Sequence, residues 1–190
     1  MHLPIRTIID GLWCAAGVVW LVGALTAKRT ARVQSMASRL LHIALGAVAM
    51  LIGFTHYFAF DPLTRPFVPA SPVVGYFGVL LTLAGVALAI WARILLGRNW
   101  SSTVTVKEDH SLVRRGPYAI VRHPIYTGLL LGLLGTAVAF REVRVLIAAG
   151  VVFVTLSLKL RIEERFMTEE FGAEYKNYQQ QVKALIPFVY

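Results

Sequence analysis

The sequence has 190 residues, of which 57% are hydrophobic and only 15% are charged, whereas soluble chains carry roughly 25% charged residues. Together with a mean hydropathy of +0.65, this composition excludes an ordinary soluble domain and favours one membrane domain over residues 1–190. The net charge is +9, but the basic residues lie in short connections between apolar runs and form no face for a duplex, so we expect membrane lipid and no nucleic acid as partner. Cys14 is the single cysteine, which excludes an internal disulfide.

Three apolar runs in the first half are long enough to cross a bilayer, which requires roughly 20 apolar residues. They are Ile8–Ala27, Leu40–Phe60 and Val73–Leu96. Four prolines between residues 62 and 72 separate the second run from the third, and this connection cannot be regular helix. We therefore expect three transmembrane helices within residues 1–96.

The second half of the chain begins with a polar stretch, which is followed by two shorter apolar runs. The runs are Ile125–Phe140 and Val143–Leu158, and we interpret them as a helical hairpin. From Lys159 to Lys183 the chain is polar and favours helix. The predicted fold class is an all-α polytopic integral membrane protein of about five transmembrane helices, the last two a hairpin, followed by a cytoplasmic C-terminal helix. Residues 97–190 would hold the chemistry.

The basic residues of the connections orient these five spans. Fourteen lysines and arginines fall in the first connection, the third connection and the tail, and four fall on the other side. Because cytoplasmic loops carry the excess of Lys and Arg, we expect the N-terminus outside and the C-terminus in the cytoplasm of an inner or plasma membrane.

Aromatic and polar side chains surround the predicted start of the fourth helix. Pro124 suits the first turn of a helix, where its missing N–H costs nothing. The positive end of that helix would attract a carboxylate or a phosphate. His123, Tyr118 and Tyr126 would add ring faces and hydrogen-bonding groups beside it.

The tail contributes a second group of charges, the paired carboxylates Glu163 and Glu164. Lys159 precedes Glu163 by four residues, so the two share a helix face and can form an ion pair. Paired carboxylates serve acid–base chemistry, and they can equally hold an ammonium group or a ribose. At this point the residues leave these uses open.

These residues form an ordered set that resembles the cofactor region of the isoprenylcysteine carboxyl methyltransferase family. The resemblance covers residues 97–190. Its motifs are His110-Ser111-Leu112-Val113, Gly116-Pro117-Tyr118, Arg122-His123-Pro124-Ile125-Tyr126-Thr127-Gly128, Glu163-Glu164, Phe171-Gly172, Tyr175, Tyr178 and Ile186-Pro187.

The resemblance implies methyl transfer from S-adenosyl-L-methionine to a lipophilic acceptor, above all the carboxylate of an isoprenylated cysteine. The family places an arginine at the substrate one turn before its glutamate; here that position is Lys159, and Arg161 is the nearby alternative. The cofactor-binding residues that the resemblance implies are Thr105, His110, Ser111, Leu112, Val113, Tyr118, His123, Pro124, Ile125, Tyr126, Glu163 and Glu164.

Other readings of the same residues remain. The His-Pro-x-Tyr string also occurs in sterol-reductase-like membrane enzymes, which would make the protein an NADPH-dependent reductase of a lipid double bond. A phospholipid or small-thiol methyltransferase, or a non-catalytic membrane scaffold, are further alternatives. The spacing of the histidines and glutamates does not demand a metal, and the oligomeric state is not set by the sequence.

Overall fold

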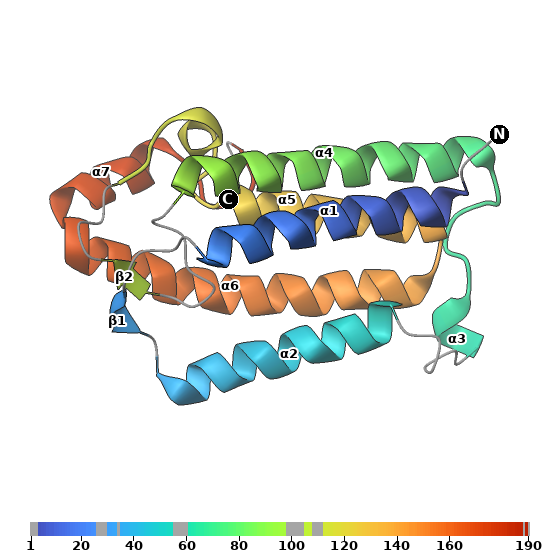
Figure 1. The fold of residues 1–190 in the computed structure, drawn as a ribbon, viewed down its shortest axis with the longest axis horizontal. Helices are drawn as coiled ribbons and strands as arrows, with labels where there is room; N and C mark the ends of the chain where they lie inside the picture. The colour runs from blue at the N-terminus through green and yellow to red at the C-terminus, as the bar shows by residue number, and fades with distance from the viewer. Residues whose placement is uncertain are drawn as a thin grey trace.

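The computed structural model of the protein describes residues 4–25, 30–33, 35–54, 61–97, 105–107, 112–187 and 189 (Figure 1). Its helices are α1 (Ile5–Leu25), α2 (Met36–Phe54), α3 (Asp61–Thr64), α4 (Pro72–Leu96), the 3₁₀ helix η3 (Gly116–Ala119), α5 (Pro124–Phe140), α6 (Val143–Phe171) and α7 (Ala173–Gln181). Two short strands, β1 (Thr30–Val33) and β2 (Thr105–Lys107), complete the described structure.

Four of the described helices, α1, α2, α4 and α6, are long and apolar enough to cross a membrane. This finding confirms the predicted helical membrane protein. Helix α5 has 17 residues and rises about 25 Å, which is somewhat less than the hydrocarbon thickness of about 30 Å. The count of five spans therefore stays a prediction.

Helix α6 differs from the predicted hairpin arm, because it does not end at Leu158. It runs without a break for 29 residues and joins the predicted fifth span to the first part of the tail. The residues after Leu158 favour helix, and the first break comes at Gly172, whose φ of 53° is left-handed. The predicted C-terminal helix is thus the end of α6 together with α7.

Helices α4 and α5 pack against each other through small residues. A Cβ atom on Gly85 would lie 2.3 Å from the backbone nitrogen of Gly132, and one on Gly135 would lie 2.4 Å from that of Thr82. The Thr82 hydroxyl donates to the Gly78 carbonyl of its own helix at 2.9 Å, so it is satisfied inside the interface. Close backbone approach of this kind is how membrane helices gain packing energy without a hydrophobic driving force.

The remaining long helices flank this pair. Helix α1 lies against α4, and α6 lies between α5 and α2 (Figure 1). One end of the bundle, here called the site end, brings together η3, α7 and the two strands, whereas α3 lies at the opposite end (Figure 1). The site end contains the last turns of α4 and the first turn of α5.

The strand pair is a departure from the expected all-helical structure. β1 and β2 are antiparallel, with Arg32 opposite Val106 and Val33 opposite Thr105. Strands of three and four residues are too short to leave a readable alternation in the sequence. The pairing joins the first connection to the third, which places both at the site end.

Candidate active site

The candidate active site forms where α5 begins and α6 leaves the apolar part of the bundle. The Tyr126 hydroxyl donates a hydrogen bond of 2.6 Å to Oε1 of Glu163. Nδ1 of His123 lies 3.5 Å from Oε2 of the same carboxylate. The His123 and Tyr126 rings are stacked, with centroids 5.4 Å apart and planes 9° from parallel. One carboxylate of α6 is therefore held against two ring side chains at the start of α5.

Lys159 adds a positive charge to the same side of α6. Its Nζ lies 4.0 Å from Oε1 of Glu163 and 5.7 Å from the centroid of the Tyr126 ring. The Lys159 and Glu163 side chains are 17% and 25% exposed, so neither is fully solvated. A cation and an anion on one face can bind groups of opposite sign on the same ligand.

Glu164 has different surroundings from Glu163, because consecutive residues of a helix point about 100° apart. Nη2 and Nε of Arg122 lie 2.6 and 2.7 Å from Oε1 of Glu164. Nε2 of Gln179, on α7, donates to Oε2 at 3.2 Å. Nε2 of His123 also lies 3.3 Å from Oε1. Glu164 thus ties α6 to the start of α5 and to α7.

The segment that follows α7 fixes the entry to α5 through its main-chain carbonyls. The backbone N–H of Arg122 donates to Lys183 at 2.8 Å, and that of His123 donates to Ala184 at 3.0 Å. The Thr127 hydroxyl donates to the Leu185 carbonyl at 2.7 Å. The N–H groups immediately before the helix are therefore already satisfied by the protein. Sequence patterns missed this contact, since a carbonyl acceptor leaves no trace in side-chain type.

His123 sits between the two carboxylates, and this position controls its charge. Burial opposes the protonated ring, but hydrogen bonds to Glu163 and Glu164, together with their negative charges, raise the pKa of His123 above its ordinary value of 6.5. His123 therefore bridges the two glutamates, with Nδ1 near the Glu163 carboxylate and Nε2 near the Glu164 carboxylate.

Tyr118 is buried among apolar side chains next to Tyr126. Its hydroxyl donates to the carbonyl of Ala92 on α4 at 3.4 Å, and its own carbonyl accepts from the Tyr178 hydroxyl. Burial raises the pKa of Tyr178 to about 12 and also raises that of Tyr118. Both phenols are neutral at physiological pH. Tyr118 packs in one cluster with Tyr126 and Leu160, so it links α4, α5 and α6.

Four other predicted site residues lie in the cluster around Tyr118 or next to it in sequence. Val113 is half-buried and packs against the Tyr118 cluster, and Leu112 is half-buried beside it in sequence. Pro124 and Ile125 are buried at the start of α5, and Ile125 belongs to the same cluster.

Arg161 is the predicted residue that the structure separates from the others. It is exposed, and it lies two residues from both Lys159 and Glu163, which places it on the other side of α6. The backbone of Thr105 lies in β2, which packs against α6. His110 and Ser111 lie outside the described residues.

Comparison with known proteins identifies the family. Residues 73–174 match the family model described as Phospholipid methyltransferase. Protein-S-isoprenylcysteine O-methyltransferase B of Arabidopsis thaliana is 32% identical over a stretch covering 75% of this chain and 74% of that protein. The Protein-S-isoprenylcysteine O-methyltransferase of Saccharomyces cerevisiae is also 32% identical, over 63% of this chain and 52% of that protein.

A solved structure of a membrane methyltransferase is also similar to this chain. The eukaryotic intramembrane Ras methyltransferase ICMT aligns with a TM-score of 0.59 and 25% sequence identity, over 83% of this chain. The present chain spans 55% of the length of that solved chain. The matched region of the family model includes α4 from Val73 onward and all of α5 and α6, and the last two helices carry the Tyr126–Glu163 contact. The chain therefore belongs to the isoprenylcysteine carboxyl methyltransferase family of membrane methyltransferases.

Proposed function

We propose that the protein transfers a methyl group from S-adenosyl-L-methionine to the carboxylate of an isoprenylated cysteine or a similar amphiphile. The family membership supports the reaction. The observation that carries the proposal is the joint position of Lys159, Glu163 and Tyr126, since it puts a cation and an anion beside an aromatic face.

The donor set at the site end fits S-adenosylmethionine, which carries an ammonium, a sulfonium, a carboxylate and a ribose diol. The Glu163 carboxylate is able to accept hydrogen bonds from the ammonium or the ribose hydroxyls. The Tyr126 ring, which lies beside Lys159, offers an aromatic face to a cation. Bound there, the cofactor would supply an activated methyl group. Tyr118, Leu112 and Val113 would complete its surroundings.

The chain's own residues then have two tasks. A substrate carboxylate is ionised near neutral pH, so no residue has to act as a general base. Lys159 binds that carboxylate as a point charge and aligns one oxygen toward the methyl group. The apolar cluster around Tyr118 and Leu160 keeps water away from the acceptor, which strengthens the interaction.

The arrangement also supports a proposed orientation. The chain is an integral membrane protein, and the strands, η3 and α7 all lie at the site end (Figure 1). These elements belong to the connections and tail that hold most of the lysines and arginines. We infer that the site end faces the cytoplasm, with the N-terminus outside. A water-soluble cofactor would enter from the cytoplasm, and a lipophilic acceptor would enter from the bilayer.

A second candidate is methylation of a phospholipid amine, which the description of the matching family model favours. An amine acceptor reacts in its neutral form and gains nothing from a neighbouring cation. Lys159 beside Glu163 therefore supports a carboxylate acceptor over an amine.

The test is a methyl-transfer assay with the purified full chain in detergent and donor labelled in the methyl group. The acceptors are N-acetyl-S-farnesylcysteine, its methyl ester as a blocked control, and phosphatidylethanolamine. We expect base-labile label on the free acid alone. Calorimetry should show micromolar binding of S-adenosylhomocysteine and none of NADPH. Label on phosphatidylethanolamine would select the second candidate, and binding of NADPH without S-adenosylhomocysteine would indicate a reductase.

A further inference from the structure

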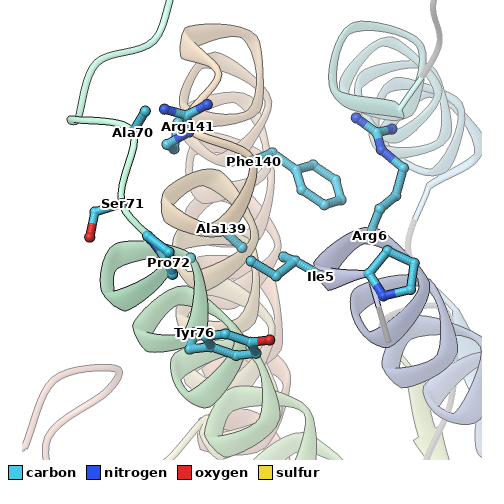
Figure 2. A pocket seen from close by; sticks show the side chains of 11 residues that line it. Ile5, Arg6, Ala70, Ser71, Pro72, Tyr76, Ala139, Phe140 and Arg141 are labelled. Carbon is cyan, nitrogen blue, oxygen red and sulfur yellow. The ribbon is translucent and has the colours of Figure 1, made fainter. Parts of the chain in front are cut away.

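A hollow of about 660 Å³ opens at the end of the bundle opposite the candidate active site (Figure 2). It lies among the first turn of α1, the first turn of α4 and the last residues of α5. Helix α4 has 25 residues, so about 37 Å of helix separates this hollow from the site end. The residues that line it are Pro4, Ile5, Arg6, Ala70, Ser71, Pro72, Gly75, Tyr76, Ala139, Phe140 and Arg141.

Two arginines give the hollow a positive rim. Figure 2 shows Arg6 on the α1 side and Arg141 on the α5 side, with the Phe140 ring between them. The Arg6 guanidinium lies 4.6 Å from the Phe140 ring centroid and 3.6 Å from Oε1 of Glu142. Glu142 also pairs with Arg144, so its single charge is shared. Among the described residues, no acidic side chain forms an ion pair with Arg141, which leaves the rim positive.

Arg141 has a backbone conformation that glycine adopts more readily. The presence of arginine at this position is therefore explained by its side chain. Arg141 has φ 61°, and it is the one non-glycine residue with positive φ in the described part of the chain. Its N–H donates to Ala137 at 2.7 Å, and its carbonyl accepts from Phe67 at 3.1 Å. Glycine would close this helix end with less strain. The arginine instead directs a guanidinium to the edge of an apolar hollow.

The hollow continues into an apolar surface along α4. Its floor is formed by Ile5 and Ala139 (Figure 2). On α4, Tyr76, Phe77 and Leu80 are 42%, 55% and 63% exposed and follow one another away from the rim. A ligand that fits has an anionic head for the arginines and an apolar body for this surface.

We propose that the hollow binds an anionic phospholipid, with the phosphate at the rim that carries Arg6 and Arg141 and the acyl chains along α4. The paired cations match a phosphodiester. The continuous apolar surface selects a lipid over a free anion, and the helix ends place the rim at the outer boundary of the membrane in the proposed orientation. This site is independent of the proposed methyl transfer.

Native mass spectrometry of the full chain tests the proposal, with equimolar phosphatidylglycerol and phosphatidylcholine added to the detergent. The wild type should retain one phosphatidylglycerol at least tenfold in preference to phosphatidylcholine. Arg141→Gly should remove this preference while the thermal midpoint stays equal or rises, because glycine suits the positive φ. Ala70→Glu, which adds a carboxylate beside Arg141 without touching a helix, should also remove it.

Arg65→Gln is the matched control, because Arg65 is an exposed arginine at the same end that does not line the hollow. It should keep the preference. Equal retention of the two lipids by the wild type would overturn the proposal. An unchanged preference in both Arg141→Gly and Ala70→Glu, or an equal loss in Arg65→Gln, would overturn it as well.

Discussion

The Tyr126 hydroxyl and the Glu163 carboxylate form a 2.6 Å hydrogen bond between the first turn of α5 and the polar part of α6. The two residues are 37 positions apart in the sequence. Their contact joins the aromatic start of one helix to the charged face of another. The next residue, Glu164, shares His123 with Glu163 but otherwise contacts Arg122 and Gln179, so we expect the two carboxylates to have different roles.

We expect Glu163→Gln to weaken binding of S-adenosylhomocysteine by roughly tenfold to a hundredfold. A hydrogen bond to a charged group contributes about 1.5–3 kcal/mol, and glutamine loses the charge while keeping the shape. Isothermal titration calorimetry in detergent measures the change. Glu169→Gln, an exposed position on the same helix, should bind as the wild type does. Equal affinity of the two variants would contradict the assignment of Glu163.

Glu164→Gln should instead lower the stability of the protein more than its affinity for the cofactor. Arg122 and Glu164 are 9% and 17% exposed, and removing one partner of a buried pair costs about 3 kcal/mol. Thermal unfolding should show the loss. The double variant Arg122→Ala/Glu164→Gln should lose less stability than the sum of the two single losses, because each single variant already removes the same pair. Additive losses would show that the two side chains do not act as a pair.

Lys159→Ala should raise the KM for the carboxylate acceptor about tenfold while leaving S-adenosylhomocysteine affinity within about twofold, since the lysine is assigned to the acceptor. Arg161→Ala is the matched control, because Arg161 lies on the other side of the helix. Initial rates against acceptor concentration separate KM from kcat. A larger effect from Arg161→Ala would transfer the substrate role to that residue.

The stability of the protein should fall as the pH rises above 6.5. The pKa of His123 is raised by Glu163 and Glu164, so the folded chain keeps a proton that the unfolded chain releases first. The stabilisation is complete below pH 6.5 and is lost as the pH passes the raised pKa. Thermal midpoints from pH 6 to 9 measure the slope. His123→Gln should flatten it, and an unchanged slope in that variant would assign the effect to another group.

Gly85→Ala should destabilise the bundle by about 1–3 kcal/mol, because the new methyl group would meet the backbone of α5 at 2.3 Å. Gly150→Ala is the control, since its methyl group would meet nothing within 4 Å. Thermal unfolding in the same detergent compares them. Similar midpoints for the two variants would mean that α4 and α5 approach less closely than the structure shows.

The sequence by itself determined the membrane class and the positions of its helices. The lack of charge between residues 73 and 92, for example, requires lipid as solvent, and Pro72 sets the start of α4 within one residue of the prediction. Helix boundaries were wrong where the chain keeps favouring helix past the apolar run, as it does after Leu158. The ordered motifs identified the family before any contact was known.

Only the tertiary structure decided how the charged residues divide their work. Adjacent glutamates look equivalent in sequence, but a helix turns about 100° per residue and gives them partner sets that overlap at His123. The same rotation brings Lys159 to Glu163 and takes Arg161 away. The carbonyls of Lys183 and Ala184 accept hydrogen bonds from the backbone just before α5. The sequence cannot predict these bonds, because every residue has a carbonyl and only the fold decides which carbonyl accepts from which N–H.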